Sequence, residues 1–153
     1  MKRNSKLSLA LHALGHMALR PQVAQTSEQI AAHHATHAVV VRRVFGLLRS
    51  AGLLTSEKGH HGGWRLARPA EAITVADIYR ALDEPFLNAA PLSPAPHGTC
   101  AIEAAMADVV SAAMVEAEAV ILRHFAARSL ADLAQAMGQA GAISSFPQGD
   151  SPL

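Results

Sequence analysis

The sequence predicts a mostly α-helical fold with one small β-hairpin. Apolar residues recur at spacings of three and four over several segments, which is typical of amphipathic helices. A glycine-rich stretch flanked by two short apolar segments is typical of a hairpin. The 153 residues include only one Trp, one Tyr and four Phe. A core of Ala, Leu and Val with few rings indicates packed helices rather than a β-sandwich, and such a small core favours a partner chain.

The first two predicted helices are bounded by capping and breaking residues. The first helix begins after Asn4 or Ser5, either of which can cap it, and runs to about Leu19. The segment 20–22, which contains a proline, ends it. The second is short and runs from a Thr26 cap to about His34, because residues 26–29 match a capping box in which Gln29 reaches back.

A third helix and a hairpin follow. The helix is predicted over residues 38–50, with a buried stripe of Val41, Val44, Phe45 and Leu48, and Gly52 is a natural stop. Residues 53–58 and 64–67 are predicted strands, joined by a turn over 59–63. The order helix, short helix, turn, helix, hairpin is that of a winged helix-turn-helix domain, which reads DNA with the third helix.

The second half of the chain predicts an oligomerisation element. A helix capped by Thr74 is expected over 75–82, and prolines prevent a continuous helix over 83–98. A long helix is then expected over 99–127, with positions alternating by four and three residues as in a coiled coil. These seam positions are Met106, Val110, Ala113, Ala117, Val120 and His124. The apolar face is wider than one small domain needs, so part of it is expected to meet a second copy.

The predicted domain organisation has four parts. Residues 1–82 form the winged helix-turn-helix domain, and 83–98 form a Pro-rich linker. Residues 99–140 hold the long dimerisation helix and a short terminal helix capped by Ser129. The tail over 141–153 is expected to be disordered.

The charge is divided unevenly along the chain. Residues 1–68 hold ten Lys and Arg against two acidic residues, a net +8, whereas residues 69–153 have a net −7. This asymmetry favours a polyanion as the partner of the first half, although clustering on solvated faces would produce the same count. The single cysteine and the absence of a recognisable signal peptide or apolar run long enough to span a membrane predict a cytoplasmic protein.

Several segments together resemble the Rrf2-type bacterial regulators. They are Lys6–Leu14, Val39–Val44, Leu47–Leu53, Lys58–Arg68 and Ile73–Ala81, and the resemblance covers roughly residues 1–128. It implies a homodimer that pairs through its long C-terminal helices and binds a palindromic operator on double-stranded DNA. We expect a transcriptional regulator, and more specifically a repressor, with an unidentified small-molecule or protein effector.

The chain departs from the sensor members of that family. Those members carry three cysteines near the start of the long helix, which bind an iron–sulfur cluster, whereas this chain has Cys100 alone. Asn88 and Pro94 stand where upstream thiols are expected, so no cofactor is predicted. His37-Ala38 also replaces the Asn-Pro that single-cysteine members often have at the turn. Cys100 itself is open to three interpretations: an inert apolar residue, a thiol sensor, or a remnant of a cluster site.

The predicted DNA-binding residues come from the N-terminal segment, the second and third helices, and the hairpin tip. The third helix is expected to reach base edges, and the others are expected to reach the DNA backbone or a groove. The set is Lys2, Arg3, Thr26, Ser27, Thr36, His37, Val39, Val40, Arg42, Arg43, Lys58, His60, His61 and Gly62. Trp64 is expected to pack the hairpin onto the body of the domain.

Three other interpretations are weighed against this one. His33, His34 and His37 suggest a metal, but a predicted helix break separates them and no acidic or thiol ligand is near, so no metal site is expected. An enzyme is not expected, because the sequence has no nucleophile elbow, P-loop or paired His-Glu motif. The remaining alternatives are a protein-interaction module with a decayed DNA-reading face, and a thiol- or metal-responsive sensor variant.

Overall fold

The computed structural model describes residues 6–59, 62–84 and 101–139 of the chain. Its elements follow the order α1 (Lys6–Leu19), α2 (Ser27–His33), α3 (Ala38–Ser50), β1 (Leu54–Glu57), β2 (Gly63–Leu66), a 3₁₀ turn η1 (Ala70–Ala72), α4 (Val75–Leu82), α5 (Ala101–Ala126) and α6 (Leu130–Gln139). This is the mostly helical fold with one hairpin that the sequence predicts, and η1 is the element that the pattern did not reveal. No helix in these ranges is both long and apolar enough to cross a lipid bilayer.

Local sequence accounts for most helix boundaries. Thr26 caps α2, its side chain accepts the Gln29 backbone N–H at 3.2 Å, and Gln29 Oε1 accepts the Thr26 N–H at 2.9 Å, so the predicted capping box is confirmed. Reciprocal bonds of this kind satisfy amides that have no partner inside a helix. The predicted Thr74 cap of α4 is also confirmed, with Asp77 completing the box.

The core lies where α1, α3 and α4 meet. Its largest fully buried side chains include Leu14, Met17, Ile30, Phe45, Leu48, Ile73, Ile78 and Leu130. The predicted stripe of α3 is confirmed, since Val41, Val44, Phe45 and Leu48 are all buried. Burying these apolar surfaces is the main stabilisation of so small a domain.

The hairpin is attached to the body through its second strand. β1 and β2 are antiparallel, with Leu54 opposite Leu66 and Glu57 opposite Gly63. Trp64 exchanges two backbone hydrogen bonds with Gln25, of 2.9 and 3.1 Å, so β2 also pairs with the residue that precedes α2. The Trp64 ring packs edge-on against Phe45 with centroids 5.4 Å apart. The expectation that Trp64 packs the hairpin onto the body is therefore confirmed.

The terminal helix α6 packs against α1, in the same core as the winged elements. A Cβ placed on Gly15 of α1 would lie 2.6 Å from Met137 Sδ of α6, which shows how closely the two helices approach. Leu130 is fully buried, and its N–H donates to Ile73 O at 2.7 Å. The sequence grouped α6 with the long helix, but these contacts place it with the winged domain.

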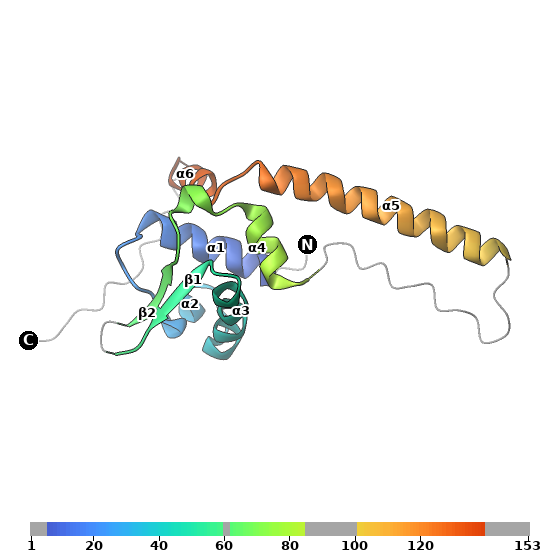
Figure 1. Ribbon diagram of the computed structural model, residues 1–153. Coiled ribbons are helices and arrows are strands. Elements are labelled where there is room, and N and C mark those ends of the chain that lie inside the picture. The colour runs from blue at the N-terminus through green and yellow to red at the C-terminus, as the bar shows by residue number, and fades with distance from the viewer. Residues whose placement is uncertain (1–5, 60–61, 85–100, 140–153) are drawn as a thin grey trace, which may run out of the picture.

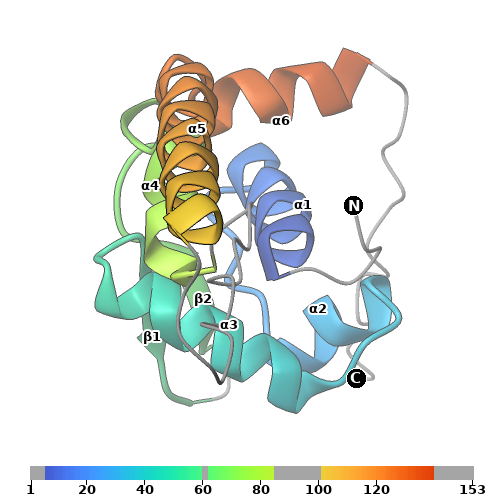
Figure 2. The ribbon, with the colours of Figure 1, turned by 90° about the vertical axis from the view of Figure 1, so that its right-hand side faces the viewer.

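The long helix α5 and the third helix α3 lie on opposite sides of the molecule. In Figures 1 and 2, α5 and α6 are at the top, while α2, α3 and the hairpin are below. α5 extends well beyond the body, and none of its residues is buried. Only its C-terminal part contacts the domain, through Phe125 against Tyr79 and through a 3.1 Å hydrogen bond from Tyr79 Oη to Glu118.

Candidate nucleic-acid interface

One face of α3 is exposed and unusually apolar at its N-terminal end. Val39 is 68% exposed and Val40 is 42% exposed, whereas Val41 in the next position is fully buried. Arg42 and Arg43 are also exposed and follow these valines along the same helix. Exposed valines beside two exposed arginines form a surface that has both methyl groups and positive charge.

The two arginines differ in their partners. Arg42 Nη1 lies 3.0 Å from Glu28 Oε1 of α2, with the two side chains 55% and 66% exposed. An exposed ion pair of this kind contributes little to stability and is easily exchanged for another partner. The side chain of Arg43 makes no hydrogen bond or ion pair with any described residue. The fold therefore leaves the Arg43 guanidinium available and holds that of Arg42 beside a carboxylate.

The turn before α3 presents a histidine. His37 is the N-cap residue of α3, is exposed, and makes no side-chain capping bond. Thr36 is half-buried, and its N–H donates to Ala31 O at 3.0 Å, which closes the turn. Ala35 has a φ of 48°, in the left-handed region that few non-glycine residues adopt. This sharp turn sets the direction in which α3 leaves α2.

Ser27 at the start of α2 corrects one sequence prediction. Its side chain is buried, and its Oγ accepts the Trp64 Nε1–H at 3.0 Å. The hydroxyl thus satisfies a buried indole N–H and is not presented at the surface, so we remove Ser27 from the set of DNA-binding residues. The neighbouring Thr26 is half-buried and uses its oxygen as the helix cap.

The hairpin presents Lys58 near its tip, at an exposed position. Gly62 and Gly63 lie at the same tip, where the backbone leaves no room for a side chain. A Cβ on Gly62 would lie 2.3 Å from Glu57 O, and Gly63, with a φ of 146°, would place one 2.8 Å from Gln25 O. Only glycine fits such close backbone approaches.

Five of the predicted DNA-binding and sensor residues lie outside the described ranges. They are Lys2, Arg3, His60, His61 and Cys100. The remaining predicted positions lie on α3, on the turn before it, at the N-terminus of α2 and on the hairpin, all on the side of the molecule opposite α5 (Figure 2). Glu28 was not among the predicted residues, because its ion pair with Arg42 depends on how α2 packs against α3.

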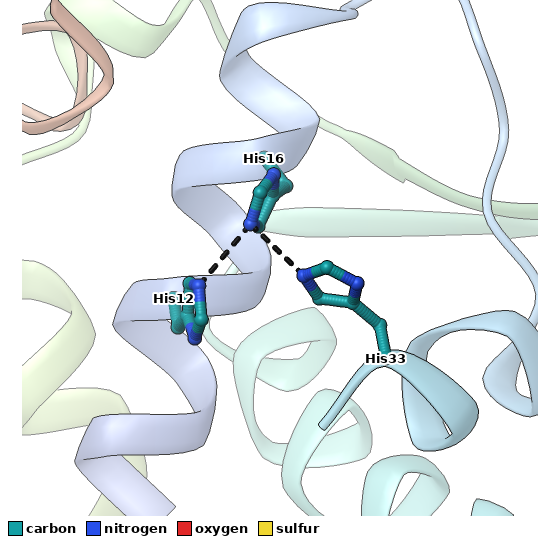
Figure 3. Close-up of side chains that lie close together, drawn as sticks. All are labelled: His12, His16 and His33. Atoms are coloured by element: carbon teal, nitrogen blue, oxygen red, sulfur yellow. Dashed lines mark hydrogen bonds between the residues drawn. The ribbon is translucent and has the colours of Figure 1, made fainter. Parts of the chain in front are cut away.

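A group of histidines lies between α1 and α2, close to this face. His12, His16 and His33 direct ring nitrogens toward one another (Figure 3), and their candidate ligand atoms all lie within 4.8 Å. The metal site weighed from the sequence was a different set of histidines, in which His33 was combined with His34 and His37. His37 is not part of the group that the fold assembles.

Comparison with known proteins places these features in a family context. Residues 3–136 match the model of the Rrf2 family, described as an iron-dependent transcriptional regulator. YwnA of Bacillus subtilis, assigned to the HTH-type transcriptional regulators, is 37% identical over 81 residues, 53% of this chain and 59% of YwnA. The HTH-type transcriptional regulator IscR of Cereibacter sphaeroides is 46% identical over 44 residues, 29% of this chain and 28% of that protein. The chain thus spans less than two thirds of the length of either relative.

Solved structures share the fold over nearly the whole chain. The structure of IscR from T. potens matches with a TM-score of 0.63 at 20% identity, covering 95% of each chain. CymR, described as the global cysteine regulator of B. subtilis, matches with a TM-score of 0.63 at 22% identity, covering 89% of this chain and 98% of CymR. These matches confirm the winged fold with a long helix that the sequence predicts.

The family is described as iron-dependent, and the ligands that this chain offers decide whether it could hold an iron–sulfur cluster. Such a cluster takes four ligands per site, most often thiolates. This chain has one cysteine, so it cannot supply a thiolate cluster site. The residues present do not fit that group.

Proposed function

The chain belongs to the Rrf2 family of transcriptional regulators, and from this premise we propose that it is a repressor that binds a palindromic operator as a homodimer. The observation that carries the proposal is the exposed face of α3, where Val39 and Val40 lie uncovered beside Arg42 and Arg43. An α-helix fits the major groove of B-DNA, where its N-terminal residues meet base edges. The family consists of transcriptional regulators, so the enzyme alternative is set aside.

The chemistry of this face suits base recognition. Valine methyl groups pack against the C5-methyl of thymine, and a guanidinium donates two hydrogen bonds to the O6 and N7 of guanine. His37, exposed and free of a capping bond at the start of α3, supplies a further ring nitrogen for a base edge or a phosphate. We propose Val39, Val40 and Arg43 as the base-reading residues, with His37 beside them.

Contacts with the DNA backbone come from the flanking elements. Thr26 lies at the N-terminus of α2, where free backbone amides favour an anion. Lys58 extends from the hairpin, and Lys2, Arg3, His60, His61 and Gly62 belong to the same proposed set. The net +8 of residues 1–68 supports this role, since neutralising phosphates supplies much of the affinity for DNA.

The homodimer is proposed to pair through α5. An apolar row remains exposed along this helix, and its members include Ile102, Met106, Val109, Val110 and Val120. Soluble monomers rarely leave so continuous an apolar surface uncovered. Pairing on the side opposite α3 leaves both recognition helices free for two half-sites, about 10 bp apart or a multiple of that. A dimer over a promoter represses by excluding the polymerase.

The test is DNA binding by the full chain, measured by fluorescence anisotropy on the region upstream of its own gene and on a scrambled duplex of equal length. We expect tighter binding to the upstream region, and a linear fall of log affinity with log salt as counterions are released. If binding is absent, or does not depend on salt or sequence, the proposal fails and a protein-interaction module takes its place. Repression is then measured with a reporter gene placed behind the bound site.

A further inference from the structure

Three histidines from two helices place their Nε2 atoms around one point. His16 Nε2 lies 3.1 Å from His12 Nε2 on the same helix and 3.2 Å from His33 Nε2 at the end of α2 (Figure 3). A tetrahedral zinc ion with Zn–N bonds of about 2.0–2.1 Å holds neighbouring nitrogens about 3.3–3.4 Å apart. The two distances to His16 are close to that value, and the three candidate ligand atoms all lie within 4.8 Å of one another, so side-chain rotations would bring them around such an ion.

Hydrogen bonding alone serves this arrangement poorly. A neutral imidazole nitrogen carries either one proton or one lone pair. His16 Nε2 faces two other Nε2 atoms, so its single proton or lone pair makes one good bond and leaves the second contact strained or shared. A cation at the centre accepts all three lone pairs at once.

Burial favours the neutral form of the two histidines on α1, which is the form that binds a metal. Burial lowers the pKa of His16 to about 4, with further lowering from the nearby His33, His12 and Arg20. Burial also lowers the pKa of His12, and His33 adds to the effect. Neutral imidazoles at these two positions can bind a metal without first losing a proton.

A fourth histidine and a pocket complete the site. His34 has its ring centroid 4.5 Å from that of His12, and its Nε2 is buried with no hydrogen-bond partner among the described residues. A buried nitrogen of this kind calls for an explanation. A pocket of about 570 Å³ is lined by His12, His33, His34, Thr36 and Val40 among others. The pocket gives solvent access to His12 and His33, two of the three histidines around that point.

We propose that His12, His16 and His33 bind a divalent first-row transition-metal ion, with Zn²⁺ as the first candidate, and that its binding changes affinity for DNA. The donors are imidazoles without carboxylates, which suits zinc, cobalt, nickel, copper or ferrous iron and disfavours Mg²⁺ and Ca²⁺. The ion would tie α1 to the last residue of α2, directly before the turn that directs α3. The coupling to DNA rests on the proposed function, whereas the metal site does not.

The metal site is tested with untagged protein freed of metal by a chelator. Co²⁺ is titrated into the full chain and followed by its visible d–d absorption, and Zn²⁺ is then added as a competitor. We expect one Co²⁺ per chain, displaced by Zn²⁺ and unaffected by excess Mg²⁺. His12→Gln, at an exposed position, and His33→Gln should each weaken binding by more than the roughly 10–100-fold that loss of an outer-shell partner costs.

The matched control is Glu71→Gln, which removes an exposed potential metal ligand on η1, outside the cluster and outside the surfaces proposed for DNA and for the dimer. It should bind Co²⁺ like the wild type, and circular dichroism should show the same helix content for all variants. Absence of stoichiometric binding, or equal affinity in His12→Gln, His33→Gln and the wild type, would overturn the metal site and leave a network of histidine hydrogen bonds.

The coupling is tested by DNA affinity with and without Zn²⁺. We expect at least about a fivefold change in the wild type, the lower end of typical coupling between sites, and none in His12→Gln. If the ion binds and DNA affinity does not change, the coupling is wrong and the metal site stands. If the ion binds and no DNA binding occurs under any condition, the proposed function fails instead.

Discussion

Arg42 and Arg43 are neighbours in the sequence, yet the fold gives them different surroundings. Arg42 is held 3.0 Å from Glu28, whereas Arg43 makes no such contact with the described residues. To contact DNA, Arg42 has to give up its ion pair with Glu28, a carboxylate that also repels phosphate. The side chain of Arg43 has no such ion pair with the described residues. From the sequence the two arginines were predicted to have the same role, because the order of residues along the chain does not show that Glu28 lies beside only one of them.

Arg43→Ala should therefore weaken operator binding more than Arg42→Ala. We expect a loss of about 1–3 kcal/mol for Arg43→Ala if it contacts guanine in two bonds. Glu28→Gln should strengthen binding by about 0.2–1 kcal/mol, the usual size of an exposed ion pair, because Arg42 is then released and a negative charge is removed. Anisotropy titrations at one fixed salt concentration measure all three.

Arg123→Ala is the control for loss of a positive charge, since Arg123 is exposed on α5, away from α3. It should leave affinity close to that of the wild type. Equal losses for Arg42→Ala, Arg43→Ala and Arg123→Ala would mean that overall charge, and not the α3 surface, determines binding.

The start of α4 shows how a short polar motif fixes an element. Asp77 Oδ2 accepts the Thr74 backbone N–H at 2.9 Å, and Thr74 Oγ1 accepts the Asp77 N–H at 3.1 Å. The Thr74 backbone N–H is the main cause that lowers the pKa of Asp77, and the Arg68 guanidinium, 3.9 Å away, adds to it. The ionised carboxylate is therefore bound more favourably in the folded state than in the unfolded chain.

This capping carboxylate should make stability depend on pH in the acid range. Because the folded pKa of Asp77 is depressed, its contribution is complete above the unfolded value of about 3.9 and is lost as pH falls through the folded value. Asp77→Asn should lower the free energy of unfolding by about 0.3–1 kcal/mol at pH 7, and should flatten its decline between about pH 5 and pH 2. Urea unfolding at a series of pH values measures both effects.

Asp108→Asn, at an exposed position on α5, provides the comparison. Its stability should follow the wild-type curve across the same pH range. If the free energy of unfolding of Asp77→Asn falls with pH as steeply as that of the wild type, the capping hydrogen bond does not distinguish the charged from the neutral carboxyl.

At the scale of the whole molecule, the two surfaces that we propose as functional lie on α3 and on α5. Along α5, five exposed apolar residues share one helical face, while Glu118 and Phe125, which contact the winged domain, lie on another. The five are Ile102, Met106, Val109, Val110 and Val120, and the exposed Val115 lies off this face. The predicted seam therefore stays free while the same helix is attached to α4. In the proposed dimer, this division would let one helix join two copies and still hold its own domain.

Dimerisation should fail when charge is added to the seam. Ala113 and Ala117 are small enough to let two helices approach closely, so Ala113→Glu with Ala117→Glu should convert the dimer to a monomer by placing like charges in apolar contact. Sedimentation velocity measures the change. Operator affinity should fall with it, because two half-sites can then no longer be bound together.

Ala112→Glu with Ala119→Glu is the matched control, at exposed positions on another face of the helix. It should remain a dimer. A seam variant that sediments with the wild type would place the interface elsewhere.

Much of the fold could be predicted from the sequence because its signals are local. Capping residues and apolar spacing located α1 to α4, and the hairpin followed from a glycine-rich turn between two short strands. Most predicted contact positions also fall on one side of the molecule, since their order along a winged domain is fixed by its topology. Ser27 was misjudged because a hydroxyl next to a cap resembles a phosphate ligand, and its burial under Trp64 depends on a residue 37 positions away.

By itself the sequence determined the helices, the hairpin and the family, because these depend on interactions over a few residues and on motifs in order. Only the tertiary structure decided which distant side chains meet: His33 with His12 and His16, Arg42 with Glu28, and α6 with α1. His12 and His16, four residues apart on one predicted helix, were the single local clue to the histidine cluster. The third ligand comes from a separate helix whose position depends on packing of the core, and a linear pattern does not specify that packing.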